Sequence, residues 1–204
     1  MTTITLTPRA AREQQTFRVL LNAMARPGSI DTVPLHEAGG EHAAVLSVIE
    51  SLVDHEVTFA VLPERADLVD LILRQTGSRA AAIDIAGYVI CDAASLSEAF
   101  DWASEGTLEY PDQGATIICS VKGIAEDCDL ALRGPGIKDV TFLAVEGFDD
   151  AALALFSECN AQPPLGLDVI FVAPDGRVAC LTRYTRIERR ESVNDPQGAV
   201  KEQS

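Results

Sequence analysis

The segment from Arg133 to Gly136, with the sequence Arg-Gly-Pro-Gly, is by residue type the part of this chain best suited to hold an anion. Its two glycines allow a tight turn that presents free amide groups, and Arg133 and Lys138 supply positive charge. The alternative is an ordinary turn that ends a strand, because glycine and proline together are common in turns. On sequence alone the turn is favoured, and Arg133, Gly134 and Gly136 are carried forward as candidate ligand contacts.

Asp168 is the second candidate, because it is a carboxylate placed inside an otherwise apolar run. Pro163 and Pro164 stiffen the approach to this run, and Gly166 permits an unusual dihedral or a close contact. A carboxylate in such a place needs a partner. It either orients a ligand or moves a proton, or it forms a buried pair with an arginine or caps a neighbouring loop. The structural alternatives are favoured, with Arg183 as one possible partner and a further candidate contact.

No familiar catalytic signature occurs in the sequence. It has no phosphate-binding Gly-x-x-x-x-Gly-Lys loop, no Gly-x-Ser-x-Gly elbow, no His-Glu-x-x-His and no dinucleotide fingerprint after a strand. The catalytic residues therefore stay unknown at this stage. His36, His42 and His55 fall in polar contexts without a supporting cysteine or carboxylate pattern, so we expect ordinary surface histidines and no metal.

Composition narrows the class of protein. With 204 residues, 47% of them hydrophobic, the chain can bury a sizeable core as one domain. A formal charge of −15 argues against a general nucleic-acid binder, because phosphate backbones need a basic surface. No apolar stretch is long enough to span a membrane and no secretion signal begins the chain, so we expect a cytoplasmic protein. The five cysteines are scattered and never form a Cys-x-x-Cys pair, which is typical of reduced core residues.

The helices are indicated by apolar residues at helical spacing. The first is expected from Pro8 to Ala25, with Thr7 as its cap and Pro27-Gly28 as its stop, before an extended segment at 29–33. Its apolar stripe should pack on the core and consists of Phe17, Leu20, Leu21 and Met24. Further helices are expected at about 41–53, 65–75 with a glycine cap at Gly77, 95–106 opened by a capping box from Ser95 to Glu98, and 150–159 capped by Asp149 or Asp150.

Strands are expected at 57–62, 88–91, 115–121, 128–132, 139–145, 167–172 and 177–181. The pair at 115–121 and 128–132 reads as a hairpin or as neighbouring strands, and Pro174-Asp-Gly176 is a strong hairpin turn. Alternating helices and strands predict an α/β single domain over residues 1–187, a mixed sheet flanked by helices on both faces. From residue 188 to Ser204 the sequence is polar and is expected to be a mobile tail.

Three segments, taken together and in this order, resemble the PhnH family, a subunit of the bacterial carbon–phosphorus lyase complex. They are residues Phe17 to Gly28, Leu132 to Ile137 and Pro164 to Ile170, and the resemblance extends more weakly over about 12–188. It implies a fold similar to the large domain of pyridoxal-phosphate-dependent transferases, without the cofactor. None of the three lysines, Lys122, Lys138 and Lys201, has an obvious Schiff-base context, so pyridoxal phosphate is not expected.

The resemblance also implies a role in phosphonate catabolism. In the family this subunit works with the G, I and J subunits, which couple methylphosphonate to ATP and expel adenine to give ribose 1-methylphosphonate 5-triphosphate. The sequence shows no acid and nucleophile pair at short spacing for such a displacement, so the bond-making residues are expected on another subunit, with the I subunit as nucleosidase.

Two functions therefore stand beside each other. The first is an accessory subunit, a homodimer in isolation, whose apolar helix faces build partner interfaces. The second is a stand-alone transferase-like enzyme or a binding protein for a phosphorylated small molecule, using the same glycine loop. Arg26 and Gly28, which end the first signature segment, join the candidate ligand contacts.

Overall fold

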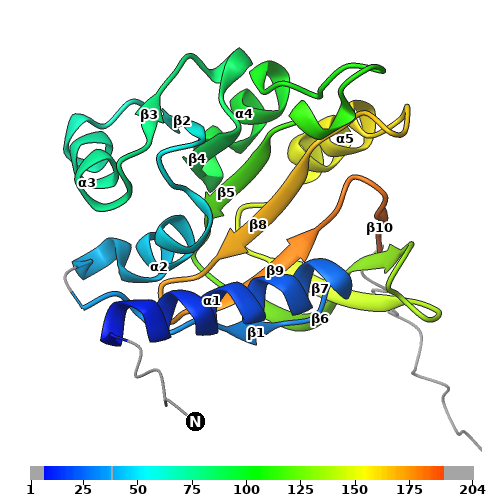
Figure 1. The fold of residues 1–204 in the computed structure, drawn as a ribbon. Helices are drawn as coiled ribbons and strands as arrows, with labels where there is room; N and C mark the ends of the chain where they lie inside the picture. The colour runs from blue at the N-terminus through cyan, green and yellow to red at the C-terminus, as the bar shows by residue number, and fades with distance from the viewer. Residues whose placement is uncertain (1–6, 38, 191–204) are drawn as a thin grey trace, which may run out of the picture.

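The computed structural model describes residues 7–37 and 39–190. Its main sheet consists of β1 (Asp31–Thr32), β2 (Thr58–Leu62), β3 (Arg79–Ala80), β4 (Tyr88–Asp92), β5 (Thr116–Ser120), β8 (Asp168–Val172) and β9 (Arg177–Leu181). The strand order is β1-β9-β8-β5-β4-β2-β3 (Figure 1). The strands from β8 to β3 are parallel, whereas β9 runs antiparallel to both of its neighbours. The sheet is therefore mixed, as the sequence predicted.

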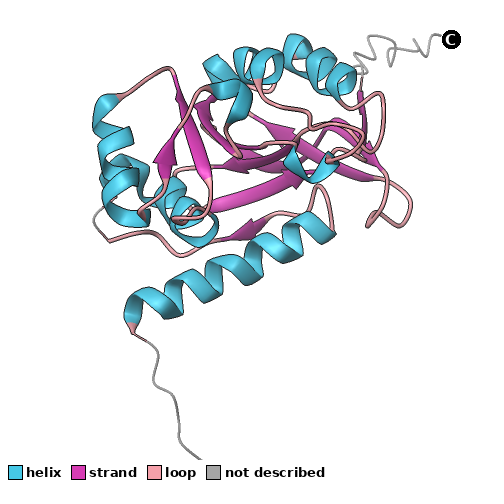
Figure 2. Cartoon of the chain, turned by 45° about the horizontal axis from the view of Figure 1, so that its top comes forward, coloured by secondary structure: helices cyan, strands magenta, loops and turns pink. Residues whose placement is uncertain are grey.

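Helices cover both faces of this sheet (Figure 2). Those of one face are α1 (Pro8–Ala25), α2 (Ala43–Leu52) and α3 (Ala66–Thr76), and those of the other are α4 (Leu96–Trp102) and α5 (Asp150–Cys159). Short 3-10 turns are η1 (Gly40–His42), η2 (Ile83–Ile85), η3 (Ala93–Ser95) and η4 (Pro111–Gln113). Because strand side chains alternate, Ile117 faces α4 and α5 whereas Ile118 faces α1 to α3. The α/β class with flanking helices is confirmed.

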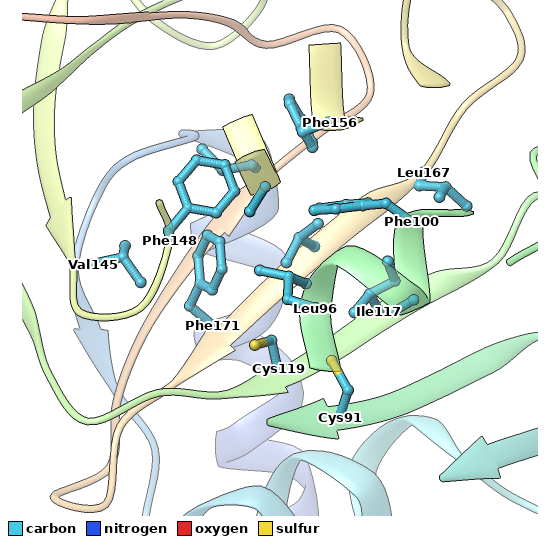
Figure 3. Close-up of a cluster of buried hydrophobic side chains, with 14 of the residues drawn as sticks. Cys91, Leu96, Phe100, Ile117, Cys119, Val145, Phe148, Phe156, Leu167 and Phe171 are labelled. Carbon is cyan, nitrogen blue, oxygen red and sulfur yellow. The ribbon is translucent and has the colours of Figure 1, made fainter. Parts of the chain in front are cut away.

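Aromatic rings fill the core between the main sheet and α4 and α5 (Figure 3). Phe148 contacts Phe156 of α5 and Phe171 of β8 edge to face, with ring centroids 6.5 and 5.4 Å apart. Phe100 of α4 meets Phe156 in the same way at 5.9 Å. Such edge-to-face contacts add to the stabilisation that comes from burying the rings. This cluster fixes α4 and α5 on the sheet.

A second sheet, which the sequence did not predict, is antiparallel in the order β10-β6-β7. Its strands are β6 (Ile124–Arg133), β7 (Thr141–Val145) and β10 (Arg186–Arg189). The expectation that residues 128–132 pair with residues 115–121 is wrong. The strand β5 already pairs with β4 on one side and β8 on the other, so it has no free edge, and β6 pairs with β7 and β10 instead. The second sheet adds Leu132 and Leu143 to the core that contains Phe171.

The predicted stripe of α1 is only partly buried. Leu20 is 2% exposed and Ala23 is fully buried, whereas Phe17 and Leu21 are 50% and 60% exposed. The buried face is instead Thr16, Leu20 and Ala23, because α1 packs on α2 and β9 through its smaller side chains. The stripe prediction was therefore wrong for Phe17 and Leu21.

Most helix ends follow their sequence signals, but both ends predicted for the helix at 95–106 do not. Thr7 caps α1, Asp149 caps α5, and Gly77 ends α3 in the left-handed conformation. The prediction of a capping box at Ser95 is wrong. The Asp92 carboxylate accepts a hydrogen bond from the Ser95 amide and so starts η3 one turn earlier. The helix that follows ends at Trp102, not at Gly106, and an extended residue follows it.

The strand β10 extends beyond residue 187, where the expected domain boundary lies. Glu188 and Arg189 belong to β10 and pair with Ala131 and Leu130 of β6. The remainder of the expected tail, residues 191–204, lies outside the described residues. Within the described ranges, no helix is both long and apolar enough to cross a membrane.

Candidate functional site

Two of the three segments that the sequence singled out, residues 17–28 and 132–137, meet at a junction between the two sheets. The Gly28 amide donates to the Cys180 carbonyl at 3.2 Å, and a Cβ on Gly28 would lie 2.5 Å from side-chain atoms of Leu132 and Thr141. Gly136, with φ +83°, lies so close to the Ala25 carbonyl that a Cβ would collide with it. The glycines at 28 and 136 therefore let the end of α1 pack directly on the loop after β6.

Gly134 completes this junction. Its φ is +145°, and a Cβ there would lie 2.8 Å from the Tyr184 carbonyl in the chain that leads into β10. The Arg133 guanidinium is on the surface and donates to the Asp139 carbonyl at 3.3 Å. Arg26 is also exposed, and its backbone amide closes α1 on Asn22. The junction thus places two arginines at the surface beside glycines that are needed for packing.

Asp168 and Arg183 form an ion pair at the amino end of β8. The Asp168 Oδ2 atom accepts from Arg183 Nη2 at 2.8 Å and Nε at 3.1 Å, while Oδ1 accepts from the Arg183 backbone amide at 2.8 Å. The two side chains are only 16% and 12% exposed. The arginine also donates to the Pro111 and Pro164 carbonyls at 3.0 and 3.4 Å. The pairing alternative of the sequence is therefore observed, and Arg183 ties the loop before β5 to the loop before β8.

A pocket that sequence reasoning missed lies at the carboxyl ends of β2, β4 and β5. The chain leaves β2 toward β3 on one side and leaves β4 toward β5 on the other, and ligands of open α/β sheets bind where the strand order reverses in this way. The cavity measures about 80 Å³, with His42, Arg65, Asp92 and Ser120 among its polar lining residues. His42 Nε2 and Arg65 Nη2 are 3.1 Å apart. The parallel strands expected from the sequence could have located this edge.

A buried carboxylate joins α1 to α2. Glu50, whose side chain is 1% exposed, accepts from Arg12 Nη2 at 2.8 Å, and its other oxygen lies 3.2 Å from His36 Nε2. His36 is only 8% exposed, so the expectation of a surface histidine is wrong for this residue. Its backbone amide bonds to the Ala43 carbonyl, which folds the polar loop back over α2. His55 is exposed as expected, and His42 is partly buried beside Arg65.

The buried cysteines are poor nucleophiles. Cys91, Cys119, Cys159 and Cys180 are buried free thiols, which confirms the prediction for these four. Burial raises the pKa of Cys159 to about 12 and raises that of Cys180 further. The pKa of Cys119 is raised mainly by a hydrogen bond with the neighbouring Cys91 thiol and, to a smaller extent, by burial (Figure 3). Among the described residues, no three His, Cys, Asp or Glu side chains are grouped closely enough to hold a metal ion.

Comparison with known proteins identifies the family of this chain. The family described as bacterial phosphonate metabolism protein (PhnH) matches residues 5–188. A protein of Stutzerimonas stutzeri, assigned to C-P lyase as subunit HtxG, is 39% identical, with 87% of each chain covered. The alpha-D-ribose 1-methylphosphonate 5-triphosphate synthase subunit PhnH of Rhizobium meliloti (strain 1021) is 30% identical over 86% of this chain and 90% of its own. The chain therefore belongs to the PhnH family of bacterial phosphonate metabolism proteins.

Proposed function

We propose that this chain is the PhnH-type subunit of a carbon–phosphorus lyase core complex. In that complex it supports the formation of ribose 1-methylphosphonate 5-triphosphate from ATP and methylphosphonate. The observation that carries the proposal is the similarity, over nearly the full length, to two proteins that are themselves named as subunits of this machinery. The proposed partners are the G, I and J subunits, and the proposed location is the cytoplasm, where reduced thiols such as the four buried cysteines persist.

The geometry supports an accessory role better than catalysis by this chain alone. Two of the residue types that could assist a displacement at a sugar carbon, a carboxylate and an arginine, are engaged with each other in the pair Asp168–Arg183. Gly28, Gly134 and Gly136 are needed where chain segments pack closely. Arg26 and Arg133 stay proposed ligand contacts, because both side chains are exposed next to these glycines. We expect the reacting groups to come from another subunit.

The proposal includes a fold similar to the large domain of pyridoxal-phosphate-dependent transferases, without the cofactor. The mixed seven-stranded sheet with helices on both faces supports the similarity of fold. A pyridoxal phosphate site needs a lysine within a pocket and a partner for the pyridine nitrogen. Lys122 and Lys138, the lysines among the described residues, are both exposed on the surface, which favours a cofactor-free subunit.

Co-expression tests this function directly. The chain is produced with the G, I and J subunits of its host, and the eluted species are weighed after size-exclusion chromatography. Co-elution in fixed stoichiometry is expected, and omission of each partner in turn identifies the subunit that retains this chain. Elution of the chain apart from all three partners would contradict the proposal.

A second candidate function rests on the cavity at the strand ends. A stand-alone binding protein for a phosphorylated small molecule would use Arg65 and His42, which lie at the place where α/β sheets bind ligands. Titration calorimetry of the isolated chain with methylphosphonate and with ATP separates the two functions. Binding that Arg65→Ala abolishes favours the second candidate, whereas no binding without partners favours the accessory subunit.

A further inference from the structure

Three large apolar side chains are exposed where α4 ends and in the loop that follows it. Trp102, Leu108 and Tyr110 are 62%, 77% and 54% exposed, and we call these three residues the 102–110 patch. Ile85, which is 69% exposed, comes from η2, a turn in contact with α4. Scattered apolar residues are normal on a surface, but large exposed groups gathered on one segment indicate an interaction site. Tryptophan and tyrosine are also enriched among the residues that dominate binding energy at interfaces.

The patch lies in one of the two long stretches of the chain that carry no basic residue; the other runs from residue 139 to residue 176. From residue 80 to residue 121 the sequence has no lysine, arginine or histidine. Its carboxylates are Asp84, Asp92, Glu98, Asp101, Glu105, Glu109 and Asp112, and all seven residues are exposed. Four of them, from Asp101 to Asp112, alternate along the chain with the apolar residues of the patch. The patch thus presents to solvent large apolar side chains that are interleaved in the sequence with exposed carboxylates.

The loop that carries the patch is held in place by internal contacts. Arg183 donates to the Pro111 carbonyl at 3.0 Å, and the Gly166 amide donates to the Glu105 carbonyl at 3.0 Å. The amides of Thr107 and Tyr110 each bond to the carbonyl of the other, at 3.2 and 3.1 Å. A surface ordered before binding loses little conformational freedom when a partner arrives. The pair Asp168–Arg183 is therefore a positioning device for this loop.

We propose that the 102–110 patch docks a basic surface of another subunit of the complex, an inference that rests on the proposed function. Electrostatic complementarity gives such a contact its specificity and speeds its formation. A second copy of this chain would bring one acidic patch against another, which like charge disfavours. Nucleic acid and anionic membranes need a basic surface, so the same carboxylates exclude them as occupants.

The experiment measures binding of purified variants to the assembled remaining subunits. Asp101→Lys with Glu109→Lys reverses two charges of the rim, and Trp102→Ser removes an apolar contact. Each is expected to weaken binding about tenfold or more, as truncations at interface hot spots do. The matched control, Glu56→Lys with Asp70→Lys, makes the same change in net charge at exposed residues elsewhere and is expected to bind like the wild type. Binding of the wild type should also weaken as salt is raised.

Each remaining outcome overturns a stated claim. If both patch variants bind like the wild type, the patch is not the contact, although the proposed function stands. If Leu21→Ser on α1 abolishes binding and the patch variants do not, the docking surface is the exposed face of α1. If the wild type alone is a dimer that Trp102→Ser converts to a monomer, the occupant is a second copy. If the wild type itself does not bind the other subunits, the proposed function fails and this inference fails with it. Circular dichroism of each variant confirms that it is folded.

Discussion

At the scale of single residues, the glycines of the signature segments act through space and backbone angle. Gly136 combines a positive φ with direct contact to the end of α1. Gly40, with φ +50°, has the same kind of backbone angle but no atom within 4 Å of the place where a Cβ would be. The two positions therefore separate the cost of the backbone angle from the cost of a collision.

Replacing Gly136 with alanine should destabilise the fold by about 2–4 kcal/mol, since a left-handed alanine and an overpacked contact add together. Gly40→Ala should lose only about 1 kcal/mol, from the backbone angle alone. Urea denaturation followed by circular dichroism measures both free energies of unfolding. Equal losses at the two positions would mean that the collision of the new methyl group with the Ala25 carbonyl adds no cost.

The raised pKa of Glu105 makes the stability of the protein depend on pH. The pKa of Glu105 in the folded protein is raised mainly by partial burial and, to a smaller extent, by repulsion from Glu158. The folded state then holds a proton that the unfolded state has already released, so this residue lowers stability as pH rises above the usual glutamate pKa. Glu105→Gln should therefore be more stable than the wild type at neutral pH, and the gain should vanish below the usual glutamate pKa. Thermal unfolding across this range tests the sign, and a gain that persists in acid would contradict it.

Single residues also show where sequence reasoning stops. The need of Asp168 for a partner could be predicted, because a carboxylate in an apolar run is costly unless paired. The contact of Arg183 with Pro111 could not, since it joins loops that are far apart in the chain. His36 was misjudged for a related reason: its partner Glu50 and the carbonyl of Ala43, which accepts from its amide, both lie several residues away in the sequence.

At the scale of elements, α1 shows the limit of periodicity as a guide. Leu20 and Leu21 are adjacent in sequence and identical in type, yet one is buried and the other is exposed. Apolar spacing located the helix, and Thr7 and Pro27-Gly28 its ends. The face that packs on α2 and β9 is turned about the helix axis from the predicted stripe, and it carries Thr16, Leu20 and Ala23. The exposed remainder of the stripe was visible only in the structure.

Leu20→Ala should lower the free energy of unfolding by about 3 kcal/mol, because it leaves a cavity under α1. Leu21→Ala should change it by no more than about 0.5 kcal/mol, as surface substitutions do. Chemical denaturation of the two variants gives both values. A large loss at Leu21 would show that this side chain is covered in the isolated protein, for example by a second copy.

At the scale of the whole molecule, the two sheets share one core. Leu132 of β6 belongs to the same buried cluster as Phe100 of α4 and Phe171 of β8. The class of fold could be predicted, because alternating helices and strands require a sheet covered on both faces. The second sheet could not be predicted, since β10 pairs with β6, which is distant in the sequence, and β10 itself has too few residues to show an alternating pattern.

This shared core predicts cooperative unfolding. Leu132→Ala in the small sheet should lower stability by about 3 kcal/mol. It should also shift the unfolding midpoint equally whether followed by circular dichroism or by the fluorescence of Trp102, the only tryptophan, which lies on α4. A shift in circular dichroism without a shift in fluorescence would mean that the small sheet unfolds independently.

The absence of basic residues between Arg79 and Lys122 also decides how the docking face can be mapped by mass spectrometry. Trypsin cleaves after lysine and arginine, so the whole 102–110 patch is released in one peptide that runs from Ala80 to Lys122. Amine-reactive cross-linkers have no target in this peptide except Lys122 at its end. Carbodiimide coupling joins carboxylates to lysines, so it can link the acidic residues of this peptide to lysines of another subunit. Any such link to another subunit would name the lysine that lies opposite.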